Sequence, residues 1–135
     1  MAKLLIIADL EGKGHATPRG LELALKLGVA VEVVAFAYAA LDRLGIGKNE
    51  QAGVRKRLLD ERRRIVQKRI DEYRGSGQKV DLTVVWEKDI HKWINKACAG
   101  DKYLAVIKTG RRTDSLVHTS TDWQLLRECP APVLI

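Results

Sequence analysis

The chain has 135 residues, of which 46% are hydrophobic and 30% charged, and its formal net charge is +7. This length suits one domain, 1–135, and the composition is that of a globular protein, which excludes intrinsic disorder. No apolar run approaches the ~20 residues of a membrane-spanning helix, and the apolar run at the N-terminus is too short for a signal peptide, so we expect a cytoplasmic protein.

Five short runs rich in apolar and β-branched residues predict strands. The first is continuously apolar and ends in an acid, as expected of a strand that is buried on both faces of a parallel sheet. The predicted strands are 3–9, 29–40, 79–86, 103–107 and a last one that opens at 133 and reaches 135.

Four segments with helical spacing of apolar residues separate these strands. Thr17 is the expected N-cap of the first helix, Pro18 its first residue and Gly28 its end. The second helix is long and the last begins with a Thr121-x-x-Gln124 capping box. The predicted helices are 18–27, 51–73, 89–99 and 121–128.

The alternation of these elements predicts an α/β fold in the order βαβαβαβαβ. Such a chain forms an open five-stranded parallel sheet with helices on both faces. Ligands bind such sheets at the carboxyl ends of the strands, where the winding reverses. The segments in which to look for a site are therefore 9–14, 37–40 and 108–121.

No catalytic or metal motif is recognisable. The histidines, His15, His91 and His118, lack zinc spacing, and the polar segment around His118 lacks a strained nucleophile elbow and an assigned orienting acid. Cys98 and Cys129 lie among apolar residues and belong to no CxxC pair, which favours buried, reduced thiols. We expect neither a metal nor an enzymatic activity.

The second predicted helix holds more than half of the net charge. Segment 50–74 carries nine basic and five acidic residues, and its basic triplets, 55–57 and 62–64, fall on several faces of the helix. Interleaved acids allow pairing along the helix, and Tyr73 is its only aromatic residue, whereas nucleic-acid surfaces add stacking side chains. A solvated face is favoured. A module that associates with nucleic acid or anionic lipid is the alternative.

The last third of the sequence carries a family resemblance. Segment 119–134, TSTDWQLLRECPAPVL, resembles the closing helix and final strand of universal stress proteins, and its Thr-Asp-Trp-x-Leu-Leu-Arg-x-Cys-Pro form resembles the first half of tandem UspE-type members. Val84-Val85-Trp86 fits this subgroup too, and the first strand ending in Asp9 agrees. The resemblance covers the whole chain. It implies the Rossmann-like, flavodoxin-like fold of that family and a non-enzymatic role in stress response.

The glycine motif of nucleotide-binding family members is largely missing. These members carry Gly-x-x-Gly, nine residues and then Gly-Ser or Gly-Thr after the fourth strand, where glycines let the backbone close on phosphates. Here Lys108 stands about where the first glycine belongs, Arg111 or Thr109 where the second does, and Thr119-Ser120 replaces Gly-Ser. We therefore expect weak or absent ATP binding and no cofactor.

A small anionic ligand is another use of the same site. Asp9 matches the acid that reaches toward adenosine in nucleotide-binding members, and it suits a simple loop cap equally well. Basic side chains beside a helix N-terminus favour an anion, with a solvated loop as the alternative, whereas Gly12-Lys13-Gly14 reads as a tight turn. The predicted binding residues are Asp9, Lys108, Thr109, Gly110, Arg111, Thr119, Ser120 and Thr121.

The resemblance also implies that domains pair through the last strand, between two chains or between tandem halves. Because an unpaired edge strand is a liability, we expect a homodimer or a second universal stress protein domain at the strand that reaches Ile135. In the second case the chain would be half of a longer protein. The main competing function is a domain that still binds ATP or another nucleotide, through Asp9, Ser120 and the basic loop.

Overall fold

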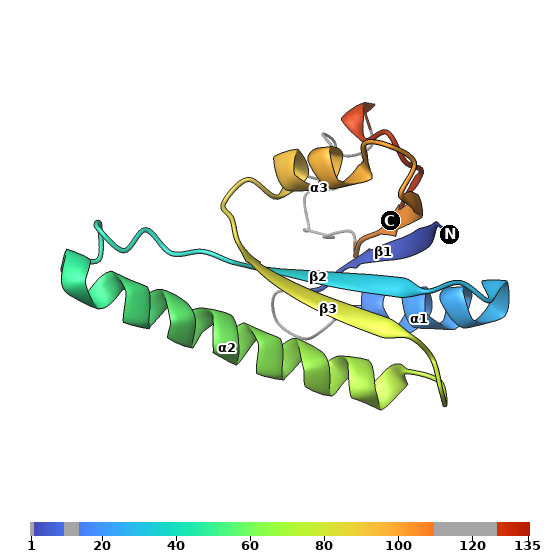
Figure 1. Ribbon diagram of the computed structural model, residues 1–135, viewed down its shortest axis with the longest axis horizontal. Helices are drawn as coiled ribbons and strands as arrows, with labels where there is room; N and C mark the ends of the chain where they lie inside the picture. The colour runs from blue at the N-terminus through green and yellow to red at the C-terminus, as the bar shows by residue number, and fades with distance from the viewer. Residues whose placement is uncertain (1, 10–13, 110–126) are drawn as a thin grey trace, which may run out of the picture.

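The structure is a computed structural model that describes residues 2–9, 14–109 and 127–135. Its five strands form one parallel sheet in the order β3-β2-β1-β4-β5 (Figure 1). The strands are β1 (Lys3–Ile7), β2 (Val31–Ala37), β3 (Val80–Trp86), β4 (Tyr103–Ile107) and β5 (Val133–Leu134). The helices are α1 (Ala16–Leu27), α2 (Lys48–Tyr73) and α3 (Ile90–Cys98). The predicted α/β fold with an open five-stranded parallel sheet is confirmed.

The sheet is covered on both faces, with α1 and α2 on one side and α3 on the other (Figure 1). Successive side chains of a strand point to opposite faces. Leu4 and Ile6 of β1 therefore pack against α1 and α2, while Leu5 packs on the α3 side. This two-sided burial explains why the strand reads as a continuous apolar run.

Helix α1 begins earlier than the sequence suggested. Its first residue is Ala16 and its N-cap is His15, so Pro18 is the third helical residue and Thr17, the predicted cap, is buried inside the helix. Pro18 is tolerated there because N–H groups of the first turn have no partner within the helix. The Ala16 N–H is instead bound by the Thr109 hydroxyl at 3.0 Å. Gly28 ends the helix in a left-handed conformation, as predicted.

The other boundaries differ by a few residues. Helix α2 begins at Lys48, three residues before the predicted start, and ends at Tyr73 as predicted. Strands β1 and β2 are shorter than expected, because β1 already ends at Ile7, and β2 begins at Val31 and ends at Ala37. Most of the last predicted helix, 121–128, lies outside the described residues, of which Arg127 and Glu128 are helical.

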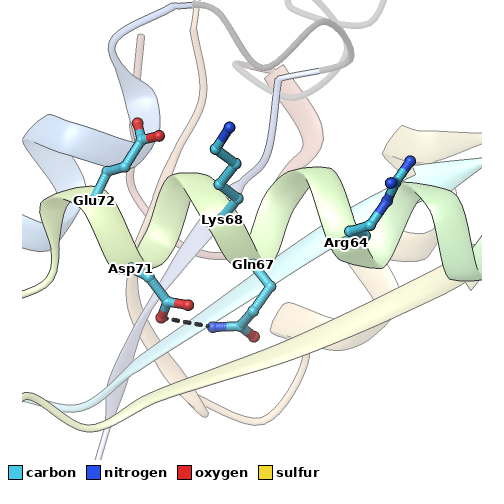
Figure 2. Close-up of a pocket in the computed structure, with 5 residues that line it drawn as sticks. All are labelled: Arg64, Gln67, Lys68, Asp71 and Glu72. Carbon is cyan, nitrogen blue, oxygen red and sulfur yellow. Dashed lines mark hydrogen bonds between the residues drawn. The ribbon is translucent and has the colours of Figure 1, made fainter.

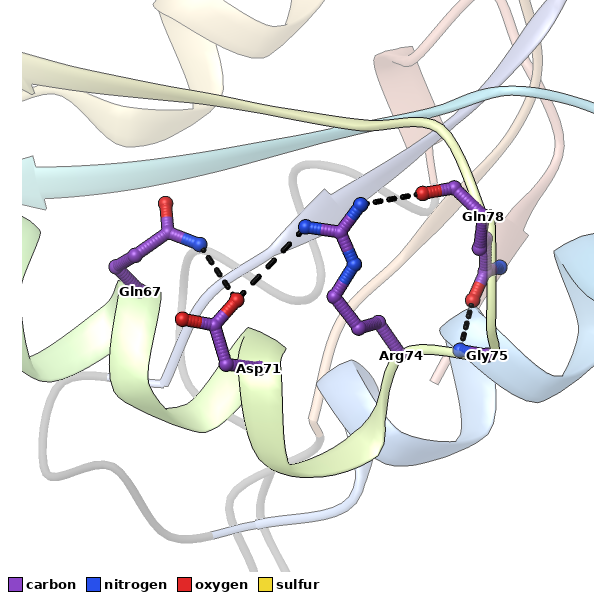
Figure 3. Close-up of polar contacts among 5 residues, drawn as sticks. All are labelled: Gln67, Asp71, Arg74, Gly75 and Gln78. Atoms are coloured by element: carbon purple, nitrogen blue, oxygen red, sulfur yellow. Dashed lines mark hydrogen bonds and ion pairs between the residues drawn. The ribbon is translucent and has the colours of Figure 1, made fainter.

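A buried glutamine organises the turn from α2 to β3. Gln78 is 7% exposed, and its side-chain amide donates to the Leu21 carbonyl of α1 at 2.9 Å and accepts from the Gly75 N–H at 2.8 Å. Figure 3 shows Arg74 joining the Gln78 carbonyl to Asp71. Nothing in the sequence singled out Gln78. It fixes the end of α2 against α1.

Within the described parts of the chain, no helix combines the length and the apolar character needed to cross a membrane.

Candidate functional site

The winding of the sheet reverses between β1 and β4. From β1 the chain moves outward to β2 and β3, and it then returns to the other side of β1 to form β4 and β5. Asp9 follows β1, and Lys108 and Thr109 directly follow β4, so these three predicted residues lie at the carboxyl edge of neighbouring strands. This is where parallel sheets bind ligands.

The Thr109 hydroxyl connects three elements at this edge. It donates a hydrogen bond to the Asp9 carboxylate and accepts one from the Ala16 N–H. The end of β4 is thereby joined to the end of β1 and to the first turn of α1. Both hydrogen-bonding roles of the hydroxyl are engaged within the domain itself.

Asp9 is a half-buried carboxyl with a raised pKa. Burial raises the pKa, and the Thr109 hydrogen bond and the nearby charges of Arg69, His15 and Lys108 oppose that effect only in part. Among the described residues its Oδ2 atom has no hydrogen-bond partner. Gly14 lies close to this carboxylate, and a Cβ at Gly14 would lie 2.7 Å from it. The φ angle of Gly14 is 103°, which also favours glycine.

Arg69 of α2 reaches the same site from a different element. Its Nη2 donates to the Gly14 carbonyl at 2.6 Å, and its guanidinium lies 5.1 Å from the ring centroid of Tyr73. Arg69 was not predicted to belong to the site. The sequence offers no signal for it, because 55 positions separate it from Gly14.

Only part of the predicted site is described. Asp9, Lys108 and Thr109 come together, and the Lys108 ammonium donates to the Thr109 carbonyl at 3.2 Å. The remaining predicted residues lie outside the described residues, and their roles stay predictions: Gly110, Arg111, Thr119, Ser120 and Thr121.

No family model matches the sequence. The chain is 26% identical to universal stress protein E of Salmonella typhi over 137 residues, which cover 96% of this chain and 43% of that protein. It is 25% identical to universal stress protein E of Escherichia coli K12 with the same coverage, and 29% identical over 93 residues to the homolog from Haemophilus influenzae, covering 67% of this chain and 30% of that one. The chain thus spans less than half the length of these curated relatives.

Solved structures share the fold over the full length. UspA from Lactobacillus plantarum has a TM-score of 0.68 at 14% identity, covering 98% of this chain and 95% of its own. The Archaeoglobus fulgidus universal stress protein in complex with dAMP has a TM-score of 0.60 at 17% identity, with 99% and 96% covered. The structural neighbours and the sequence relatives match this chain over nearly the same residues. Together they support the assignment of this chain to the universal stress protein family.

A universal stress protein in complex with cAMP is a further structural neighbour, with a TM-score of 0.60 at 12% identity and 100% and 97% covered. The curated relatives and the structural neighbours together support the predicted family and its UspE-like character. That this domain corresponds to the first half of tandem members stays a prediction.

A shallow hollow of about 510 Å³ follows the outer surface of α2. Figure 2 shows Gln67 and Asp71 joined by a hydrogen bond on one side of the helix, while Arg64, Lys68 and Glu72 extend on the other. Two basic and two acidic side chains balance one another here. This part of α2 has the character of the solvated face that the sequence favoured.

Cys98 lies apart from this edge of the sheet, in the core on the α3 side, whereas Cys129 packs against that core and is only partly buried, not buried as predicted. Cys98 is 2% exposed, and burial, together with the neighbouring Cys129 thiol, raises its pKa to about 12. Both thiols are free. A thiol with so high a pKa is a poor nucleophile, so Cys98 acts as a core residue.

Proposed function

We propose that this universal stress protein domain is a non-enzymatic, cytoplasmic stress-response domain with a degenerate nucleotide site. It acts through association with a partner or through a small anionic ligand. The observation that carries this proposal is the contact between Thr109, Asp9 and the first N–H of α1, because it engages both hydrogen-bonding roles of the Thr109 hydroxyl at the end of β4.

Side chains at the end of β4 support the same conclusion. Glycines at this position let a backbone approach phosphate oxygens closely, whereas Lys108 and Thr109 carry side chains, and that of Thr109 points into the junction of β1, β4 and α1. A nucleotide that used the Thr109 hydroxyl would have to displace the Thr109–Asp9 hydrogen bond, which would leave a half-buried polar group without a partner.

Nucleotide binding is the second candidate function. Two structural neighbours are complexes with dAMP and with cAMP, and Asp9 keeps one carboxylate oxygen without a partner among the described residues. The cations Arg69 and Lys108 lie close enough to Asp9 to lower its pKa. A nucleotide that entered here would contact Asp9 through its sugar and the basic side chains through its phosphates.

Calorimetric titration of ATP into the nucleotide-stripped protein, with magnesium and at two salt concentrations, separates the two functions. We expect no saturable heat from a protein that circular dichroism shows to be folded. Saturable one-to-one binding of ATP that the Asp9→Asn variant weakens would overturn the proposal of a degenerate site and establish nucleotide binding instead.

The proposed partner is a second universal stress protein domain, in another chain or in tandem. It would pair along β5, the edge strand beside β4, where Leu134 and Ile135 are 47% and 40% exposed. Light scattering after size-exclusion chromatography should give a dimer that Leu134→Lys converts to a monomer. A monomer at all concentrations would remove self-association from the proposal.

A further inference from the structure

A second hollow, of about 270 Å³, lies where β2 and β3 end. It is lined by the loop 38–43, by Gln51 and Arg55 in the first part of α2, and by Trp86, the last residue of β3. Its volume falls below the about 300–1,000 Å³ typical of pockets for drug-sized ligands. A single ring system suits it better than a whole cofactor.

Two aromatic side chains meet in this hollow. The rings of Tyr38 and Trp86 lie 5.7 Å apart between centroids with an interplanar angle of 50°, and Tyr38 remains 49% exposed. The Arg55 guanidinium lies 5.1 Å from the centroid of the Trp86 ring. The fold thus places stacking side chains beside the basic helix, where the sequence had indicated only Tyr73.

Contacts within the domain hold the shape of this hollow. The Gln51 side-chain amide donates to the Asp42 carboxylate at 2.6 Å and to the Ile46 carbonyl at 3.0 Å. Leu41, which is 6% exposed, anchors the same loop in the core. Asp42, the acidic residue that lines the hollow, is therefore hydrogen-bonded to Gln51. Arg43 and Arg55 supply positive charge.

The excess charge of α2 lies in its N-terminal part, which includes Gln51 and Arg55 at the hollow. Segment 48–64 carries seven basic and three acidic residues, whereas 65–73 carries two of each. Within the described chain, no ion pair engages Arg55 or Arg63. Arg63 donates to the Leu82 carbonyl at 3.4 Å, which places it over β3, about two helical turns from Arg55.

We propose that this domain binds single-stranded nucleic acid, with one base stacked on Tyr38 and Trp86 and with Arg43, Arg55 and Arg63 contacting the phosphates. Bases stack on exposed aromatic rings whatever their sequence, and cations that no acid neutralises attract the backbone. A base that is turned out of a single strand suits the small volume of the hollow. The proposed degenerate nucleotide site, at β1 and β4, is not needed for this binding.

The test measures fluorescence anisotropy of a fluorescein-labelled oligothymidine of about 16 nucleotides at several salt concentrations. Tyr38→Ala should weaken binding about fivefold or more through lost stacking. Arg55→Gln and Arg63→Gln should weaken it as well, and each should reduce the salt slope by about one. Tyr73→Ala is the matched control, because Tyr73 is also 49% exposed but lies at the far end of α2, and it should bind as the unaltered protein does.

Quenching of tryptophan fluorescence by the unlabelled oligothymidine gives a second readout that does not depend on the stability of Tyr38→Ala. Trp86→Phe keeps a ring in place, so it should retain binding and lose most of the quenching. Absence of binding at low salt, equal losses in Tyr38→Ala and Tyr73→Ala, or quenching that survives Trp86→Phe would each overturn the proposal. Asp9→Asn should leave oligothymidine binding unchanged. Failure of this proposal can therefore be told apart from failure of the proposed function, which the ATP titration tests.

Discussion

At the scale of single residues, Asp9 combines a raised pKa with a position that the sequence identified. The residue type and its place after the first strand predicted a role at the strand end. The fold then surrounded it with Gly14, Thr109 and Arg69. Burial of the carboxyl disfavours its charged form, and the surrounding polar groups recover only part of that cost.

This balance gives a pH-dependent contribution to stability. The pKa of Asp9 in the folded protein lies above the ordinary value of 3.8, so between these two pH values the folded state holds a proton that the unfolded state has released. The free energy of unfolding therefore falls as the pH rises through this window, and that loss persists at neutral pH.

Replacing Asp9 by Asn should accordingly raise the melting temperature at pH 7, since Asn accepts the Thr109 hydrogen bond without burying a charge. The gain should shrink below pH 3.8, where the native carboxyl is protonated too. Thermal unfolding of both proteins at the two pH values measures this. A less stable variant at pH 7 would mean that the contacts of the charged carboxylate outweigh its burial.

At the scale of elements, α1 is positioned by contacts with residues from outside its own segment. Thr109 binds its first N–H, Gln78 binds its Leu21 carbonyl, and Gly20 lets it approach the sheet. A Cβ on Gly20 would lie 2.5 Å from Cδ1 and 2.7 Å from Cγ1 of Ile6, a side chain that is fully buried. The sequence predicted the helix, and these contacts determine where it begins and how closely it packs.

Gly20→Ala should therefore destabilise the domain by about 1–3 kcal/mol through overpacking, although alanine is the better helix former. Gly53→Ala is the matched control in α2, where nothing lies within 4 Å of an added Cβ, and it should stabilise by roughly 0.5–1 kcal/mol. Urea unfolding of both variants decides the point. If Gly20→Ala were also stabilising, α1 would not be packed against Ile6 as described.

Gln78 allows a second prediction about an element, the turn from α2 to β3. Gln78→Ala leaves the Leu21 carbonyl and the Gly75 N–H without their partner, which should cost about 1–3 kcal/mol. Gln67→Ala removes an exposed contact to Asp71 and should change the unfolding free energy by less than about 0.5 kcal/mol. Similar values for the two variants would contradict the structural role assigned to Gln78.

At the scale of the whole molecule, the two helical layers share one sheet. Val33 and Val34 of β2 are both fully buried but point to opposite faces, into the α1–α2 core and the α3 core. Loss of either helical layer would expose apolar side chains of the strands on which the other layer packs. Folding should therefore be cooperative across both layers.

We expect a single unfolding transition in urea, with coincident midpoints by far-ultraviolet circular dichroism and by tryptophan fluorescence. Trp86 lies next to Arg55 of α2, and Trp93 belongs to the core on the α3 side. Trp86→Phe and Trp93→Phe should thus give fluorescence transitions that coincide with the loss of helix. Separate midpoints would show that one layer unfolds before the other.

The amino-acid sequence by itself predicted the class of fold and the family resemblance. Strands that are buried on both faces appear in the sequence as continuous apolar runs, and helices appear as apolar residues at helical spacing. The alternation of such strands and helices predicts a parallel sheet. It also placed Asp9, Lys108 and Thr109 at strand ends. All of these inferences rest on neighbours along the chain or on a motif of contiguous residues.

Tertiary structure alone decided which distant residues meet. Thr109 binds Ala16 across 93 positions, Arg69 binds Gly14 across 55 and Gln78 binds Leu21 across 57. The Tyr38–Trp86–Arg55 group is likewise assembled from a loop, a strand and a helix. Local patterns carry no information on such pairs, because the order of strands and the tilt of the helices bring them together only when the sheet has formed.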